Sequence, residues 1–236
     1  NKISSKSNKY IFESFDKALD LIKKNKIIGL INCPVSKESL FKKRYQGITE
    51  YLSKKNRKNG KECMLMFNKK LSVSPVTTHI PLKDVNKKIN KDSIINNVEA
   101  INNFYKENLN IKPKIALLGL NPHCETKSKY NEEIKIIIPS IRKLREKKIN
   151  VSGPFSADTF FIKKNISKYN SVVGMYHDQI LTPFKTIFGF KASNITLGLP
   201  FLRLSVDHGP NESMLGKNKS NTNSLENIFN FINLIR

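Results

Sequence analysis

Three of the four histidines in this chain each follow closely on a short apolar run of the sequence. They are His79, His123 and His177. Neutral imidazole is the commonest protein ligand for zinc and similar divalent metals, and three protein ligands with one open position are typical of a catalytic site. The pattern therefore indicates a candidate metal site. The alternative for each histidine taken singly is a structural or surface role.

A second group of polar side chains lies between residues 172 and 209. Its members are separated by apolar segments and comprise His177, Asp178, Lys185, Asn194, Arg203, Asp207 and His208. One apolar run leads into His177 and Asp178, and a second leads into Arg203. Enzymes with α/β folds place ligand-binding groups at the carboxyl ends of buried strands in this way. For any one residue, a core histidine or an ordinary surface charge remains the alternative.

Three carboxylates could orient the imidazole rings by hydrogen bonding, as the hydrogen-bond partners of metal-binding histidines often do. The candidates are Asp158, Asp178 and Asp207. Helix capping is an equally good interpretation of each. Cys124 follows His123 and could compete as a ligand, although a small buried residue is the alternative.

Apolar periodicity predicts strands that alternate with amphipathic helices. The predicted strands are residues 27–31, 63–67, 71–76, 115–120, 171–176 and 194–199, with a further strand beginning at 151. The predicted helices are residues 10–24, 93–109, 132–147 and 224–235, and another begins near Thr49. This alternation favours an α/β sandwich with a largely parallel sheet.

Composition places the chain among globular proteins that can bury a substantial core. It has 236 residues, of which 39% are hydrophobic and 26% are charged. No run approaches the roughly 20 apolar residues needed to cross a bilayer, so we expect no membrane partner. Three widely spaced cysteines without a C-x-x-C pair favour reduced thiols and a cytoplasmic location.

The formal net charge of +23 raises the question of nucleic-acid binding. Of the 42 basic residues only six are arginine, the residue that base and phosphate recognition favours. We therefore expect no specific nucleic-acid partner. A basic surface would still attract anionic substrates that carry phosphate.

Six blocks, in order along the chain, resemble the 4-hydroxythreonine-4-phosphate dehydrogenase family. They are residues 77–82 (TTHIPL), 119–123 (GLNPH), 153–159 (GPFSADT), 175–179 (MYHDQ), 194–201 (NITLGLPF) and 207–209 (DHG). The resemblance implies an isocitrate/isopropylmalate-dehydrogenase-like α/β/α sandwich with two lobes around a central cleft. It also implies one catalytic region over residues 1–236.

The resemblance further implies an NAD-dependent enzyme of pyridoxal phosphate biosynthesis. Its reaction would oxidise and decarboxylate 4-phosphooxy-L-threonine to 3-amino-2-oxopropyl phosphate. A divalent metal (zinc, cobalt or magnesium) would bind His79, His123 and His177. The enzyme would be a homodimer with shared sites, in which His177 comes from the partner subunit. Thr49, Lys185, Asn194 and Arg203 would bind the phosphorylated hydroxy amino acid.

The chain departs from the family pattern at residues 47–50 (GITE), where Ile48 replaces a substrate-contacting histidine. The loop at residues 32–37 (NCPVSK) keeps only the family's proline and lysine. We also expect the family's glycine-rich amino-terminal segment to be missing. The alternatives are a dehydrogenase of 4-phosphoerythronate or phosphothreonate, and a non-catalytic protein that binds phosphometabolites or nucleic acid.

Overall fold

The structure is a computed structural model that describes residues 5–42, 44–45, 47–57, 60–125, 131–210, 212–214 and 216–235. The chain divides into two compact units. Unit 1 contains Asn1–Glu62 and Phe190–Asn233, and unit 2 contains Cys63–Gly189 and Leu234–Arg236.

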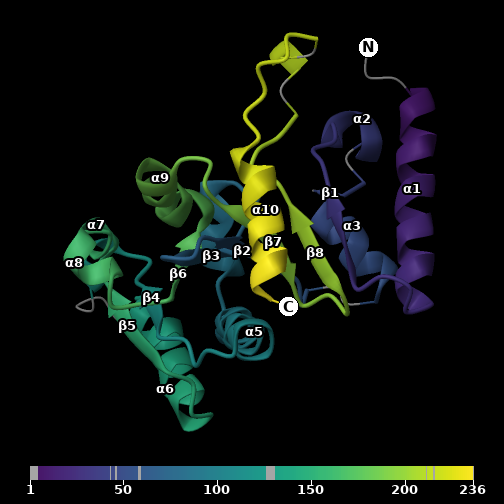
Figure 1. Ribbon diagram of the computed structural model, residues 1–236. Helices are drawn as coiled ribbons and strands as arrows, with labels where there is room; N and C mark the ends of the chain where they lie inside the picture. Colours follow the sequence, from purple (N-terminus) through teal and green to yellow (C-terminus); the bar gives the residue numbers. More distant parts are fainter. Residues whose placement is uncertain are drawn as a thin grey trace. The chain divides into compact units, whose positions relative to one another are not determined.

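Unit 1 combines a small mixed sheet with helices from both ends of the chain (Figure 1). Its strands are β1 (Gly29–Asn32), β7 (Ser193–Leu197) and β8 (Leu202–Ser205). Its helices are α1 (Ser5–Lys23), α2 (Lys37–Phe41), α3 (Ile48–Lys55), the 3₁₀ turn η4 (Glu212–Met214) and α10 (Asn223–Leu234), whose last residue falls in unit 2. Strand β8 pairs in parallel with β1 and antiparallel with β7.

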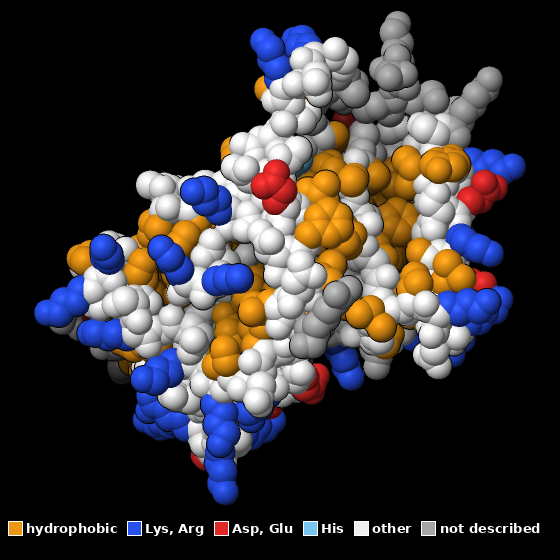
Figure 2. All heavy atoms as spheres, in the orientation of Figure 1, with side chains coloured by type: hydrophobic (Ala, Val, Ile, Leu, Met, Phe, Trp, Pro, Cys, Tyr) orange, Lys and Arg blue, Asp and Glu red, His pale blue; other side chains and the backbone are white. Residues whose placement is uncertain are grey.

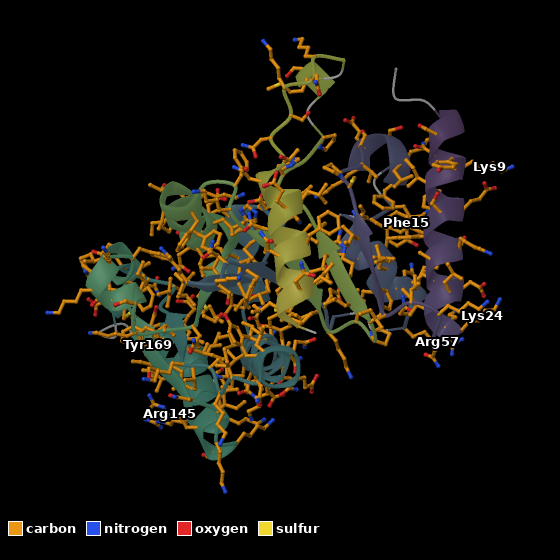
Figure 3. The ribbon with its side chains drawn as sticks, in the orientation of Figure 1. Lys9, Phe15, Lys24, Arg57, Arg145 and Tyr169 are labelled. Atoms are coloured by element: carbon orange, nitrogen blue, oxygen red, sulfur yellow. The ribbon has the colours of Figure 1, made fainter. Side chains whose placement is uncertain are left out.

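Helix α1 is amphipathic, as its apolar spacing predicts. Phe15 and Leu19 are buried and pack in one cluster with Phe41, Tyr51 and other apolar side chains of α2 and α3. Figure 3 shows Phe15 pointing inward from α1, whereas Lys9 and Lys24 point to the outside. The apolar face of α1 therefore closes the core of unit 1.

Unit 2 is built on a sheet with the strand order β2–β3–β6–β4–β5. The strands are β2 (Cys63–Phe67), β3 (Ser72–Thr77), β4 (Ile115–Leu118), β5 (Val151–Phe155) and β6 (Ser171–Tyr176). Strands β3, β6, β4 and β5 are parallel, and β2 is antiparallel to β3. The helices are η1 (Leu82–Asp84), α4 (Val85–Lys88), α5 (Lys91–Leu109), η2 (Pro122–Cys124), η3 (Glu133–Ile137), α6 (Ile138–Glu146), α7 (Ala157–Phe160), α8 (Lys163–Ile166) and α9 (His177–Phe188).

The parallel strands of unit 2 are covered on both faces. Helix α9 packs against β3 and β6, and α5 packs against β2, β3 and β6. In the view of Figure 1 these two helices lie on opposite sides of the strands. All residues of β4 are fully buried, as continuous apolar strands in such a sheet must be.

The structure confirms most predicted elements and corrects others. The strand at residues 171–176 is β6, and the predicted helix 93–109 is α5, which begins earlier because Asn90 forms a capping box with Ser93. Helix α9 was not predicted, because Pro183 lies inside it. The sequence predicts that Arg203 follows an apolar strand, but Arg203 lies within β8. The largely parallel sheet predicted from the sequence is found in unit 2, whereas the strands of unit 1 pair in both directions.

Lysine and arginine side chains are scattered over the face shown in Figure 2, with a group at the end of α6, where Arg145 is labelled in Figure 3. Among the described residues, none of the helices combines the length and apolar character that crossing a bilayer requires.

Candidate functional site

Three neighbouring parallel strands of unit 2 lead into the three predicted metal ligands. Strand β6 lies between β3 and β4, with Thr77 paired to Tyr176 and Leu117 paired to Val173. His79 follows β3, His177 begins α9 directly after β6, and His123 lies in η2 after β4. Since these strands are parallel, their carboxyl ends lie at one edge of the sheet. The sheet therefore brings all three histidine-bearing segments to that edge.

Two of the three imidazoles lie side by side. The ring centroids of His79 and His177 are 5.7 Å apart, with an interplanar angle of 43°. Both rings line a pocket of about 330 Å³. Its other lining residues are Thr78, Ile80, Leu82, Val85, Tyr176 and Asp178. The structure thus brings His79 and His177 together within one chain.

Asp178 fixes one ring of this pair. Its Oδ1 lies 2.6 Å from Nδ1 of His177. With a hydrogen on Nδ1, the carboxylate accepts a hydrogen bond and leaves the lone pair of Nε2 for a ligand. This contact matches one of the two roles that the sequence left open for Asp178, and its role in orienting a metal ligand stays a prediction.

His123 has a different environment. Its side chain is 80% exposed, and its Nδ1 lies 3.7 Å from Oδ2 of Asp158. The hydroxyl of Ser156 donates a 2.5 Å hydrogen bond to Asp158. This hydrogen bond is the main cause that holds the pKa of Asp158 below its usual value, with a smaller contribution from His123. Asp158 is therefore a ready anionic neighbour for His123.

The donor chemistry of the histidine pair fits a divalent metal, because two imidazoles meet and one is already oriented by a carboxylate. Within the described part of the chain, however, no three histidine, cysteine or carboxylate side chains are close enough to hold an ion together. Among the described residues, one chain therefore brings together two candidate ligands, and His123 does not join them.

The second polar cluster lies in unit 1 around Arg203, which is only 3% exposed. Its Nε donates to Oδ1 of Asn32 at 2.9 Å, and its Nη1 donates to Oγ1 of Thr196 at 2.9 Å. A longer contact of 3.5 Å joins Nη1 to Oγ1 of Thr49. Strand pairing explains the cluster, because β8 lies between β1, which carries Asn32, and β7, which carries Thr196.

Burial changes the acid–base properties of Arg203. Loss of solvation lowers the pKa of its guanidinium to about 10, and the negative charge of Glu50 partly opposes this shift. Oε2 of Glu50 is itself buried and has no hydrogen-bond partner among the described residues. Oδ1 of Asn194 is also buried without a partner in the described part of the chain. Buried acceptors of this kind favour a ligand that donates hydrogen bonds.

The other predicted residues fall in separate places. Thr49, Asn194 and Asp207 belong to unit 1, and Lys185 lies on α9 of unit 2. The backbone N–H of Asp207 donates to Ser224 Oγ at 2.9 Å. Asp207 and the three histidines thus belong to different units, and a role for it behind the histidines stays a prediction.

Sequence reasoning missed several residues of these clusters. Asn32 and Thr196 hold Arg203, and Glu133 and Gln179 contact the loop that carries His123. Only the strand register reveals the first pair. For Glu133, a glutamate that opens an apolar run was the one available signal. Cys124 is partly buried, and desolvation raises the pKa of its thiol, which opposes a role as a thiolate ligand.

Unit 1 also contains a cavity of about 720 Å³. It is lined by residues of α1, of the loop after β1 and of the segment after β8, together with Phe190. The rings of Phe190 and His208 meet edge to face there, with centroids 6.2 Å apart. A mostly apolar cavity with a few polar groups is the usual form of a cofactor site.

Comparison with known proteins identifies the relatives of this chain. The family model described as pyridoxal phosphate biosynthetic protein PdxA matches residues 1–232. A 4-hydroxythreonine-4-phosphate dehydrogenase from Sulfurihydrogenibium sp. is 44% identical over 210 residues, which are 87% of this chain and 64% of the relative. The chain therefore spans less than two thirds of that relative's length.

Solved structures confirm the fold class. The 4-hydroxythreonine-4-phosphate dehydrogenase of Klebsiella pneumoniae superposes with a TM-score of 0.86 at 29% identity, covering 100% of this chain and 73% of that one. The enzyme of Burkholderia phymatum gives a TM-score of 0.80 at 31% identity, covering 99% and 72%. The α/β fold predicted from the sequence is thus the fold of these proteins.

Proposed function

We propose, since this chain belongs to the PdxA family of pyridoxal phosphate biosynthetic proteins, that it carries a dehydrogenase site for a phosphorylated hydroxy amino acid. The proposed substrate is 4-phosphooxy-L-threonine. Its C3 alcohol loses a hydride and a proton to become a ketone. The resulting β-keto acid loses carbon dioxide and gains a proton at C2, which leaves 3-amino-2-oxopropyl phosphate.

The observation that carries this proposal is the histidine pair at the ends of β3 and β6. His79 and His177 would hold a divalent zinc, cobalt or magnesium ion, with His123 as the third ligand. The ion would supply Lewis-acid polarisation of the substrate hydroxyl. Asp178 would keep Nδ1 of His177 protonated, so that Nε2 faces the ligand. Asp158 would have the same effect on His123.

We propose that the cluster around Arg203 in unit 1 binds the phosphate and carboxylate groups of the substrate. Arg203 supplies a buried positive charge, and it holds the hydroxyl of Thr196 and approaches that of Thr49. Asn194 adds a side-chain amide, and none of the described residues donates a hydrogen bond to its buried oxygen. Lys185 of α9 would add a further positive charge. Arginine binds carboxylate and phosphate in a planar, two-pronged geometry that lysine cannot reproduce.

NAD would accept the hydride, and we place its rings in the cavity of unit 1. The support is the apolar lining around Phe190 and His208, with Lys219, Ser220 and Asn221 as nearby polar residues. Titration with NADH, followed by its fluorescence, tests this placement. Phe190→Ala should weaken NADH binding, and an unchanged dissociation constant would remove the cofactor from this cavity.

We also propose that the active unit is a homodimer with shared sites. The support is that one described chain brings together two of the three histidines. Because His79 and His177 meet within one chain, a shared site would take His123 from the other chain, not His177 as expected from the sequence. A His123→Ala chain mixed with a His177→Ala chain then regenerates one intact site. Zinc content that reappears on mixing supports sharing. Dimers that form without regaining zinc would assign the site to one chain.

The direct test of the reaction is NADH formation from 4-phosphooxy-L-threonine, with and without added zinc, cobalt or magnesium. Parallel assays use 4-phosphoerythronate and phosphothreonate, which separate the related dehydrogenases. Metal-dependent NADH formation with 4-phosphooxy-L-threonine as the best substrate supports the proposal. A better rate with another acid would reassign the substrate, and binding without turnover of any would support a non-catalytic protein.

A further inference from the structure

The loop that carries His123 has an unfavourable backbone conformation. His123 and Cys124 are consecutive non-glycine residues with positive φ angles of 54° and 52°. Side chains rarely adopt this left-handed region, so it persists where neighbouring groups hold the backbone in place. The contacts of this loop therefore show what determines the position of His123.

A buried carboxylate makes three of these contacts. Glu133, the first residue of η3, is 0% exposed. Its Oε1 accepts hydrogen bonds from the backbone N–H groups of Leu120 at 2.7 Å and Asn121 at 2.8 Å. Its Oε2 accepts a 2.8 Å hydrogen bond from the Asn121 side chain. A buried carboxylate is costly unless it is hydrogen-bonded in this way.

A second side chain ties the same loop to the helix that begins with His177. The amide Nε2 of Gln179 donates to the carbonyl oxygen of Gly119 at 2.7 Å, and its Oε1 accepts from the Met175 N–H at 2.7 Å. The close approach of Cys124 and Glu133 to the backbone at residue 119 requires glycine there. A Cβ there would lie 2.7 Å from Sγ of Cys124 and 3.0 Å from Oε1 of Glu133.

We propose that Glu133 is a positioning residue for His123, and that Gln179 fixes the same loop to α9 behind His177. This inference takes the metal from the proposed function, whereas the hydrogen bonds that position the loop are independent of any metal. His79 and His177 already meet, whereas His123 is exposed and depends on its loop. Glu133 acts through the hydrogen-bond donors of Leu120 and Asn121 and does not touch the imidazole.

Glu133→Gln tests the role with little change in shape. The amide oxygen can still accept from the backbone, but its NH₂ group then faces the NH₂ group of Asn121, and these two donors repel. Zinc affinity, measured by competition with a chelating dye, should fall by about 10- to 100-fold, the range typical of outer-shell partners. Glu133→Ala should lose at least as much zinc affinity. Gln179→Ala should also lose zinc affinity, although the carboxylate of Glu133 is retained.

Two matched controls separate positioning from stability. Glu132→Gln alters the neighbouring glutamate, which accepts a 2.9 Å hydrogen bond from the Asn121 side chain, and should cost less zinc affinity than Glu133→Gln. Ile137→Val, in the same turn and 0% exposed, should lower the melting temperature without changing zinc affinity. If Ile137→Val and Glu133→Gln lose equal amounts of zinc affinity, the role of Glu133 is merely structural and the proposal is overturned.

A second readout does not need the metal. Histidine ring signals in NMR spectra of the metal-free protein should shift for His123 in Glu133→Gln and remain in place for His208 of unit 1. Folded Glu133 variants with unchanged His123 signals and wild-type zinc affinity would contradict the inference. If the wild-type protein binds no zinc, the metal assignment fails, and the His123 signals alone decide the positioning role.

Discussion

The two polar clusters of this chain are built in opposite ways. Arg203 in unit 1 is 3% exposed and donates hydrogen bonds to Asn32 and Thr196. The histidine pair in unit 2 lies in an open pocket, and the His177 side chain is 36% exposed. The arginine is thus part of the core of its unit, whereas the imidazoles contribute to the surface of theirs.

Because of this difference, substitutions in the two clusters should affect different properties, namely folding stability and ligand binding. A buried charge that loses a partner, or is itself removed, disturbs the fold because its neighbours stay desolvated. Exposed imidazoles cost the fold little, so their removal should affect ligand binding alone. The comparison therefore predicts that substitution of Arg203 changes stability and that substitution of His79 or His177 changes metal binding.

The largest expected effect is that of Arg203→Ala on folding. It removes a buried charge, leaves Asn32 and Thr196 without their donor, and isolates the charge of Glu50. We expect a loss of about 3–5 kcal/mol in the free energy of unfolding. Urea denaturation followed by circular dichroism measures it. A loss below about 1 kcal/mol would show that Arg203 is not integrated into the fold.

The next effect is that of His177→Ala on metal-dependent stability. Without metal, the free energy of unfolding should change by no more than about 0.5 kcal/mol, as for most surface substitutions. At a hundredfold excess of zinc over its dissociation constant, the wild-type protein should gain roughly 2.7 kcal/mol, and the variant should not. Thermal melts with and without zinc measure the difference. The same shift in both proteins would remove His177 from the metal site.

Asp178→Asn should have an intermediate effect. The amide can no longer accept as a charged partner of His177 Nδ1, so the ring loses its preferred tautomer. Zinc affinity should fall by about 10- to 100-fold, while the fold is unchanged. Isothermal titration measures this, with the exposed Asp92 of α5 substituted in the same way as a control. If both variants keep full affinity, Asp178 is only a surface residue.

The smallest expected effect is that of Thr49→Ala on stability. Its hydroxyl lies 3.5 Å from Nη1 of Arg203, at the limit of a hydrogen bond. We expect a loss of at most about 1 kcal/mol, against the larger loss for Arg203→Ala. Binding of 4-phosphooxy-L-threonine should weaken more clearly if Thr49 contacts the substrate. Unchanged affinity in calorimetry would exclude that contact.

Local pattern was sufficient to predict where the histidines lie. Buried runs such as residues 171–176 are read directly from apolar residues, and His177 follows the strand as predicted. The pattern could not predict Arg203 inside β8, because a charge in a strand is tolerated only where Asn32 and Thr196 meet it from other strands. Long-range pairing, not local sequence, decides such cases.

The same limit applies to α9 and to Glu133. A proline within α9 reads as a helix break, although packing against β3 and β6 stabilises the helix. Glu133 reads as a surface charge, although the loop at Leu120 and Asn121 donates to it in the core. Both become clear only from tertiary contacts.

The most direct test of the account is a cobalt titration followed by visible absorption. The central claim is that His79 and His177 bind the metal, so Co²⁺ should develop ligand-field bands in the wild-type protein that are lost in His79→Ala and in His177→Ala. His208→Ala serves as the histidine control and should keep them. Identical cobalt spectra in the wild type and in the His79 and His177 variants would contradict the claim.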